Sequence, residues 1–262
     1  MEFYGLVNGC EDYLNKIKID RIQSWNGNVD SEKLTEMINR KIRMEKIAIK
    51  DVKMRTFITE DVNRNEMVQH VYDITYGTVR RGVDTLVVID DSIVRGTTLK
   101  ESIIRMLARL QPKRIVVVSS SPQIRYPDCY GIDMSKMGDF IAFNAAMELH
   151  KERGTEGLLK ELYDECKELL RMDQLHTVNV AKKVYKPFTN EEITKKIAQL
   201  ITPPELEIPV DVIFQTIETL HQACPNNLGD WYFTGNYPTP GGNRVVNKAF
   251  MNYMEGKTAR GY

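Results

Sequence analysis

LVVIDDSIVRGTT, at residues 86–98, joins an apolar run, a polar loop and the first residues of a helix. The run from Leu86 to Ile89 is short and rich in β-branched residues, which is typical of a strand buried in a parallel sheet. From Thr98 onward, apolar residues at helical spacing predict a helix that ends before Pro112. Residues 114–120, RIVVVSS, predict a second buried strand. Strand, helix and strand within about 35 residues form a βαβ unit, so the sequence predicts an α/β fold with a parallel sheet flanked by helices.

Ahead of this unit, the chain is predicted to be mainly helical. Apolar residues at steps of three and four predict a helix from Phe3 to Ile17 and another over residues 31–43. Residues 46–61 alternate and are rich in lysine, which predicts an exposed strand and loop with a solvated lysine face. Residues 66–76 predict a further short helix.

The second half of the chain is predicted to be a helical extension. Helices are expected from Gly154 onward, after the capping box at residues 189–192, and over Val212–Leu220. Because no clear strand is visible there, we expect two domains, residues 1–150 with the sheet and residues 151–262 as a mostly helical extension. This extension ends in a tail rich in Gly, Pro and aromatic residues, including Trp231, which is expected to be packed rather than to stack on bases.

Composition excludes several classes of protein. The 262 residues carry 36 Lys and Arg against 36 Asp and Glu, so a mainly electrostatic nucleic-acid binder is not expected. The four cysteines are scattered, which argues against a zinc ribbon or a disulfide framework and favours a reduced, cytoplasmic setting. No apolar run approaches the length of a membrane span. The histidines show no spacing typical of metal ligands and are expected to be structural or exposed: His70, His150, His176 and His221.

The polar loop after the first strand carries the chemistry. Asp90 and Asp91 stand where a parallel strand ends, the usual ligand edge of an α/β sheet, and can hold hydrated Mg²⁺ or accept hydrogen bonds from ribose hydroxyls. The turn of residues 95–98, Arg-Gly-Thr-Thr, can direct N–H groups and hydroxyls at a phosphate. Because this loop lacks the lysine of a nucleoside-triphosphate loop, a sugar phosphate with vicinal hydroxyls is the expected ligand. The alternative to a ligand-binding loop is a solvated loop whose side chains only cap the helix.

Three motifs together resemble the type I phosphoribosyltransferases, and in particular the amidophosphoribosyltransferase family. They are the loop of residues 86–98, MRTFI at residues 54–58 and SSSPQIRYPDCYGIDM at residues 119–134. They occur in the family's order, and the resemblance covers roughly residues 1–150. GDWYFTGNYPTPGG, at residues 229–242, looks like a longer, divergent branch of the same family.

The resemblance implies a phosphoribosyltransferase that binds phosphoribosyl pyrophosphate (PRPP) and displaces pyrophosphate with ammonia, giving phosphoribosylamine for purine biosynthesis. Asp90 and Asp91 would bind the ribose hydroxyls and Mg²⁺. Arg55, with Lys53, would lie on a closing loop and neutralise the departing pyrophosphate. The 5′-phosphate would be held by a cradle of seven residues: Ser92, Ile93, Val94, Arg95, Gly96, Thr97 and Thr98. Purine nucleotides as inhibitors and a homo-oligomer are also implied.

Three departures from the family pattern bear on activity. The family's glutaminase domain begins with a nucleophilic cysteine, whereas Glu2 stands at position 2 here and Cys10 lies on an apolar helix face. Met54 occupies a position where the family usually has glycine. No counterpart of the family's first core strand precedes the opening helix, so we expect the C-terminal part of a longer protein or a truncated product. A non-catalytic PRPP or nucleotide sensor and an inactive fragment are the alternatives.

Residues after the second strand have weaker signals. Arg125-Tyr126-Pro127 could orient a carboxylate or a phosphate, or simply brace a loop. Tyr130 and Asp133 are expected to support the site without contacting substrate.

Overall fold

The computed structural model of this protein describes most of the chain, namely residues 2–25, 30–45, 47–50, 72–74, 77–128, 134–227 and 229–259. The chain forms two compact units. One contains Met1–Val52 and Tyr72–Thr78, and the other contains Lys53–Val71 and Val79–Tyr262.

The first unit contains two helices and a pair of short strands. α1 (Glu2–Ser24) and α2 (Ser31–Asn39) confirm the two helices predicted there. β1 (Ala48–Lys50) pairs with β2 (Tyr72–Ile74) in an antiparallel ladder. The predicted helix over residues 66–76 is therefore wrong at β2, because pairing with a distant strand overrides the local helical spacing. The remainder of that prediction lies outside the described residues.

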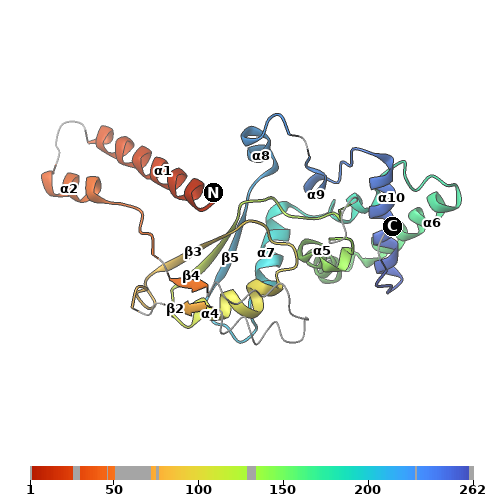
Figure 1. Cartoon of the computed structure of the whole chain (residues 1–262), viewed down its shortest axis with the longest axis horizontal. Helices are drawn as coiled ribbons and strands as arrows, with labels where there is room; N and C mark the ends of the chain where they lie inside the picture. The colour runs from red at the N-terminus through yellow and green to blue at the C-terminus, as the bar shows by residue number, and fades with distance from the viewer. Residues whose placement is uncertain are drawn as a thin grey trace. The chain divides into compact units, whose positions relative to one another are not determined.

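The second unit is built on a parallel sheet of three strands in the order β3, β4, β5 (Figure 1). β3 (Thr85–Asp90) and β4 (Arg114–Ser119) confirm both predicted strands and their parallel pairing. The register aligns Asp90 with Ser119, and Ser119 with the last residue of β5. The carboxyl ends of all three strands therefore lie along one edge of the sheet.

The third strand, β5 (Val210–Phe214), corrects the prediction of a helix over Val212–Leu220. A strand precedes the helix α8 (Ile217–Ala223), whose N-cap Thr216 accepts the N–H of Thr219 at 3.1 Å. A short apolar run fits the spacing of a helix as well as that of a strand. Here pairing with β4 and burial of Val212 favour the strand. The extension is thus mostly helical but also supplies one strand to the sheet, and the boundary at residue 150 stays a prediction.

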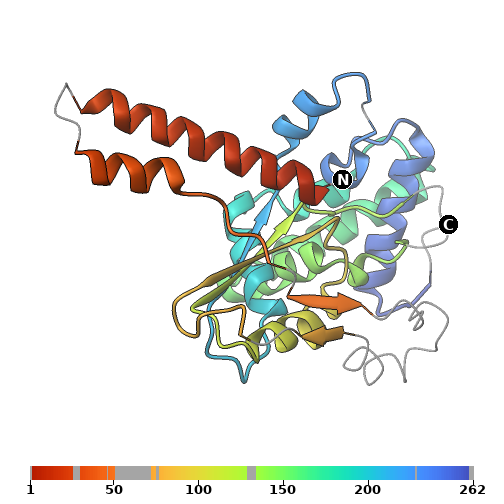
Figure 2. The same cartoon turned by 60° about the vertical axis from the view of Figure 1, so that its left-hand side comes forward.

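Side chains of the sheet alternate between a buried and an exposed face. Leu86, Ile115, Val117 and Val212 are more than nine-tenths buried. Next to them in the strands, Val87 is 57% exposed and Ile213 is 54% exposed. Helix α7 (Asn190–Ile201) packs against β5 and against α5 (Ile141–Arg153), as Figures 1 and 2 show.

The connection between β3 and β4 contains a loop, then a π-helical turn, η2 (Leu99–Ile103), and then α4 (Ile104–Ala108). The remaining elements are η3 (Met137–Asp139), α6 (Glu156–Arg171), η4 (Val180–Val184), α9 (Trp231–Thr234) and α10 (Pro240–Met254). The capping box predicted at α7 is present: Thr189 and Glu192 exchange side-chain and backbone hydrogen bonds. None of the helices described is long and apolar enough to cross a membrane.

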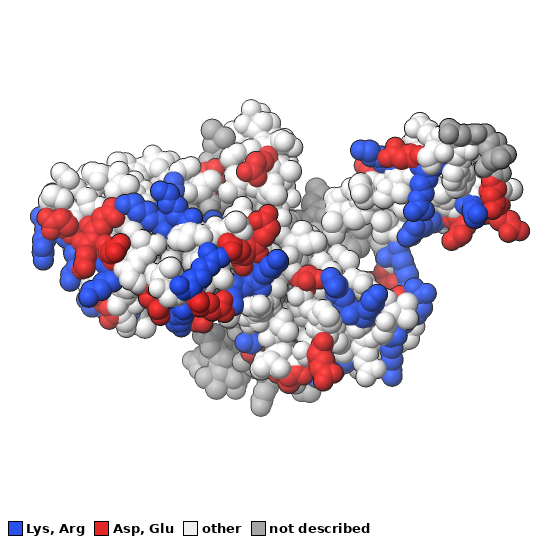
Figure 3. Space-filling model, turned by 180° about the vertical axis from the view of Figure 1, so that it is seen from behind, with Lys and Arg blue, Asp and Glu red and all other residues white. Residues whose placement is uncertain are grey.

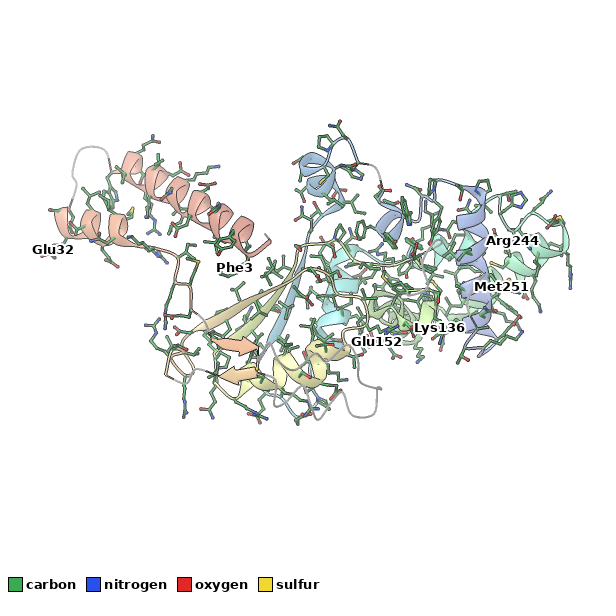
Figure 4. The ribbon with its side chains drawn as sticks, viewed as in Figure 1. Phe3, Glu32, Lys136, Glu152, Arg244 and Met251 are labelled. Carbon is green, nitrogen blue, oxygen red and sulfur yellow. The ribbon has the colours of Figure 1, made fainter. Side chains whose placement is uncertain are left out.

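Hydrogen-bonded polar side chains hold the helices around α10 together. Asn247 is fully buried: its Nδ2 donates to the carbonyl of Val178 at 2.7 Å, and its Oδ1 accepts the N–H of Val180 at 2.9 Å. His150 of α5 is also fully buried, with Nδ1 and Nε2 each 2.9 Å from the Thr155 hydroxyl and the Val184 carbonyl, respectively. Side chains fill the space between these helices, with Met251 of α10 among them (Figure 4). The expectation of a structural role for His150 agrees with its burial.

Candidate functional site at the carboxyl end of β3

The candidate site begins where β3 ends. Asp90 is half-buried as the last residue of the strand, and Asp91 is exposed as the first residue of the loop. Ser120, just beyond β4, donates its N–H to the Asp90 carbonyl at 3.0 Å and its hydroxyl to the Asp91 carbonyl at 3.1 Å. These two bonds engage backbone oxygens. The Asp91 carboxylate accepts a further hydrogen bond from the Ser92 hydroxyl at 3.3 Å, which leaves its other oxygen for a ligand.

The two adjacent carboxylates make this strand end electrostatically unfavourable without a cation. Burial raises the pKa of Asp90 above the usual aspartate value, and the neighbouring Asp91 carboxylate raises that pKa further. Oxygen donors of this kind suit Mg²⁺, which keeps several waters and commonly takes only one or two carboxylates from the protein. Within the described ranges, no group of three or more His, Cys, Asp or Glu could hold a metal ion. The pair therefore fits Mg²⁺ whose other ligands are water and substrate oxygens.

Glycine is required at position 96 by both backbone conformation and space. Gly96 has a φ of +73°, which side-chain-bearing residues rarely adopt, and a Cβ there would lie 2.8 Å from Cγ2 of Ile201. The last turn of α7 thus presses directly on the loop. The Ile141 N–H of α5 donates to the Val94 carbonyl at 2.7 Å, and Ile93 is 2% exposed. The loop is clamped from two helices and presents a preformed surface.

The helix that follows the loop begins with unpaired donors. Lys100 donates its N–H to the Gly96 carbonyl at 3.0 Å, while the N–H groups of the preceding residues have no intrahelical acceptor, as at every helix start. Thr97 and Thr98 are exposed, and the Thr98 side chain makes no capping hydrogen bond. The π-helical turn that follows is of a kind found often at functional sites. This helix start can bind an anionic oxygen group.

The structure brings together one part of the predicted site. The residues from Asp90 to Thr98 form one continuous loop, with Arg95 paired to Asp139 at 3.1 Å. Lys53, Met54, Arg55, Tyr130 and Asp133 lie outside the described residues. Sequence reasoning missed Ser120, whose bonds to the acidic strand end depend on the pairing of β3 with β4.

The tail around Trp231 is packed, as expected. The Tyr232 carbonyl of α9 accepts the N–H groups of Arg125 at 2.9 Å and Tyr126 at 3.1 Å. The rings of Trp231 and Tyr232 lie 5.5 Å apart, and both residues are partly buried. This tail braces the segment that follows β4.

The paired aspartates lie at the carboxyl end of a parallel strand, where α/β proteins bind ligands, and the clamped loop leads into a helix start that can bind an anion. Comparison with known proteins then shows which sequences this chain is similar to. The chain is 33% identical over 130 residues to amidophosphoribosyltransferase of Haemophilus influenzae, covering 46% of this chain and 25% of that protein. It is 30% identical over 115 residues to the Escherichia coli amidophosphoribosyltransferase, covering 44% of this chain and 22% of that protein. The resemblance to amidophosphoribosyltransferases is thereby confirmed.

The chain spans about a quarter of the length of these curated relatives. No protein-family model matches it. Among solved structures, it is similar to glutamine PRPP amidotransferase from B. subtilis complexed with ADP and GMP. That similarity has 24% sequence identity and a TM-score of 0.40, and covers 74% of this chain and 32% of the other.

Proposed function

We propose that this chain binds PRPP at the carboxyl end of β3 and acts as a phosphoribosyltransferase of the amidophosphoribosyl type. It would displace pyrophosphate from PRPP with ammonia and so form phosphoribosylamine for purine biosynthesis. The observation that carries the proposal is the clamped loop from Asp90 to Thr98, with two adjacent carboxylates at one end and a helix start at the other. The named relatives support the choice of reaction.

The two ends of the loop would hold the two ends of the ribose phosphate. Asp90 and Asp91 would accept hydrogen bonds from the vicinal ribose hydroxyls and ligate Mg²⁺. N–H groups of the helix start, with the hydroxyls of Thr97 and Thr98, would hold the 5′-phosphate. Bound Mg²⁺ would supply positive charge to the pyrophosphate oxygens. Since Gly96 is held against Ile201, the distance between the two ends is set by the fold rather than by the ligand.

Catalysis would rest on orientation and charge. Ammonia is already a nucleophile, so no strong general base is required. The loop would hold the anomeric carbon in line between ammonia and the departing pyrophosphate, and the aspartates would favour the positive charge that develops on the ribose. From the family resemblance, Arg55 and Lys53 would neutralise the pyrophosphate. Inhibition by purine nucleotides, assembly into a homo-oligomer and a cytoplasmic location belong to the same proposal.

The test is PRPP binding to the full chain by isothermal titration calorimetry, with and without Mg²⁺. The double variant Asp90→Asn, Asp91→Asn should lose about 100-fold or more in affinity, because each carboxylate makes charge-assisted hydrogen bonds worth about 1.5–3 kcal/mol. Asp164→Asn, at an exposed position on α6, is the matched control and should bind normally. Unchanged affinity in the double variant would refute the proposed site.

A protein that binds PRPP without catalysis is the second candidate, because Asp90, Asp91 and the helix start are groups that would bind the ligand rather than react with it. Ammonia-dependent release of pyrophosphate from PRPP separates the two. Release that requires Mg²⁺ and is lost in the double variant supports the enzyme. PRPP binding with no release supports the sensor or the inactive fragment.

A further inference from the structure

The outer edge of β5 faces a groove that the proposed reaction does not use. β5 is at the edge of the sheet, and two adjoining cavities of about 420 and 470 Å³ lie along it and along α7. Lys195, Ala198 and Asp211 line both cavities, and the two together are called the groove. Cavities of this size are typical of ligand sites.

The backbone of β5 presents free hydrogen-bonding groups to this groove. Gln215 donates its N–H to the Ser119 carbonyl at 3.1 Å, and Ile115 donates to the Pro209 carbonyl at 3.0 Å. In a parallel ladder, alternate residues face the same neighbour, so Asp211 and Ile213 also bond to β4. The N–H and C=O groups of Val210, Val212 and Phe214 therefore point away from β4. An open strand edge of this kind is a template for one more strand.

A fixed guanidinium lies at the end of the groove where β5 finishes. Arg125 donates from Nη2 to Gln123 Oε1 at 2.6 Å and to Asn190 Oδ1 at 2.7 Å, and it lies 5.0 Å over the Tyr185 ring. All of these partners are neutral. Among the residues that the structure describes, no carboxylate forms an ion pair with Arg125. Its positive charge is thus held in place by neutral groups of the described part of the chain.

The other charged groups of the groove are balanced or paired. Glu191 and Lys195 stand one turn apart on α7 with opposite charges, and Asp211 pairs with Arg114 at 2.7 Å. The uncharged walls combine neutral polar side chains with six apolar residues: Pro122, Ala198, Val212, Phe214, Ile217 and Phe233. Acidic and basic side chains interleave over the face of the molecule shown in Figure 3. The unbalanced charge of the groove is therefore that of Arg125.

We propose that this groove binds an extended peptide with a free C-terminal carboxylate. The peptide backbone would pair with Val210, Val212 and Phe214, while its carboxylate would bind Arg125. Because Arg125 lines the groove together with Phe214 and Gln215, at the carboxyl end of β5, the peptide would run parallel to β5. Alternate side chains of the peptide would face α7 and should be apolar. This proposal is independent of PRPP binding.

The first test compares two probes on the wild-type full chain. Acetyl-Val-Ser-Val-Ser-Val with a free carboxylate should bind about tenfold or more tightly than its C-terminal amide, because a charge-assisted pair with Arg125 is lost in the amide. Arg125→Gln should abolish the difference. Arg109 is exposed and precedes β4 in the chain, so Arg109→Gln should preserve the difference between the two probes. Equal binding of the two probes, or binding of neither, would overturn the proposal.

The second test is amide hydrogen exchange at single residues of β5. The peptide acid should slow exchange of Val212 and Phe214 by about tenfold or more, since their N–H groups become bonded. Asp211 and Ile213, already bonded to β4, are internal controls and should not change. Inorganic phosphate is the comparison ligand. If phosphate displaces the peptide and β5 shows no protection, the site takes a small anion and the proposal is wrong.

Discussion

The segments that follow β3 and β4 lie at the same edge of one sheet but carry opposite charge. At the end of β3, no cation among the described residues pairs with Asp90 or Asp91. Beyond β4, the described partners of the Arg125 guanidinium are all neutral. Each segment is clamped by its own contact with α7, through Gly96 against Ile201 in the first case and through Asn190 in the second. The difference suits the cation-dependent ligand proposed for the first strand end and the carboxylate proposed for the second.

The largest loss of stability is expected from adding a side chain at Gly96, where the loop after β3 packs against α7. Gly96→Val should lower the free energy of unfolding by about 2–5 kcal/mol, combining left-handed backbone strain with a clash against Ile201. It should also abolish PRPP binding. Urea denaturation measures the first effect and calorimetry the second.

Gly82→Val is the matched control for that variant. Gly82 has a φ of +68°, but a Cβ there meets nothing within 4 Å, so only the backbone strain is expected. Equal losses of stability in the two variants would show that contact with α7 does not clamp the loop.

The clamp after β4 should be broken by Gln123→Leu. Gln123 is 7% exposed; its Oε1 accepts from Arg125, and its Nε2 donates to Thr194 Oγ1 at 2.8 Å. Leaving these partners unpaired should cost about 1–3 kcal/mol of unfolding free energy in urea denaturation. Gln23→Leu, at an exposed position on α1, should change it by less than about 0.5 kcal/mol. PRPP affinity should not change in Gln123→Leu, and a large loss would show that the two strand ends act as one site.

The bridge between the two strand ends should be weakened by Ser120→Ala. The hydroxyl donates to the Asp91 carbonyl at 3.1 Å, so its loss should cost about 1 kcal/mol of unfolding free energy. PRPP affinity should fall modestly, because the aspartates would be held less firmly. Calorimetry and urea denaturation on the same samples separate the two effects.

The smallest effect concerns pH. Because burial and Asp91 raise the pKa of Asp90, the folded chain holds this proton at pH values where the unfolded chain has lost it. Its contribution to stability is present below the usual aspartate pKa and is lost as pH rises through the raised value. Asp90→Asn should remove this dependence and slightly stabilise the chain at neutral pH, while weakening PRPP binding. A neutral-pH stability below that of the wild type would contradict this electrostatic account.

Much of the sheet and the acidic site was predictable because the signals are local. The run from Leu86 to Ile89 is apolar and β-branched, the aspartates follow it directly, and the capping box at Thr189 lies within four residues. β5 was not predictable in the same way. Val-Asp-Val-Ile-Phe, residues 210–214, fits a short helix or a strand, and pairing with a strand about 95 residues earlier decided the outcome.

The sequence by itself determined the parallel βαβ core, the acidic end of β3 and the resemblance to amidophosphoribosyltransferases. Each depends on residues adjacent along the chain, whose spacing reflects local geometry. Only the tertiary structure decided that Gly96 lies against Ile201, that β5 completes the described sheet and that Arg125 lies at the end of a groove. These features join segments far apart in the chain, and their energies come from contacts that no local pattern records.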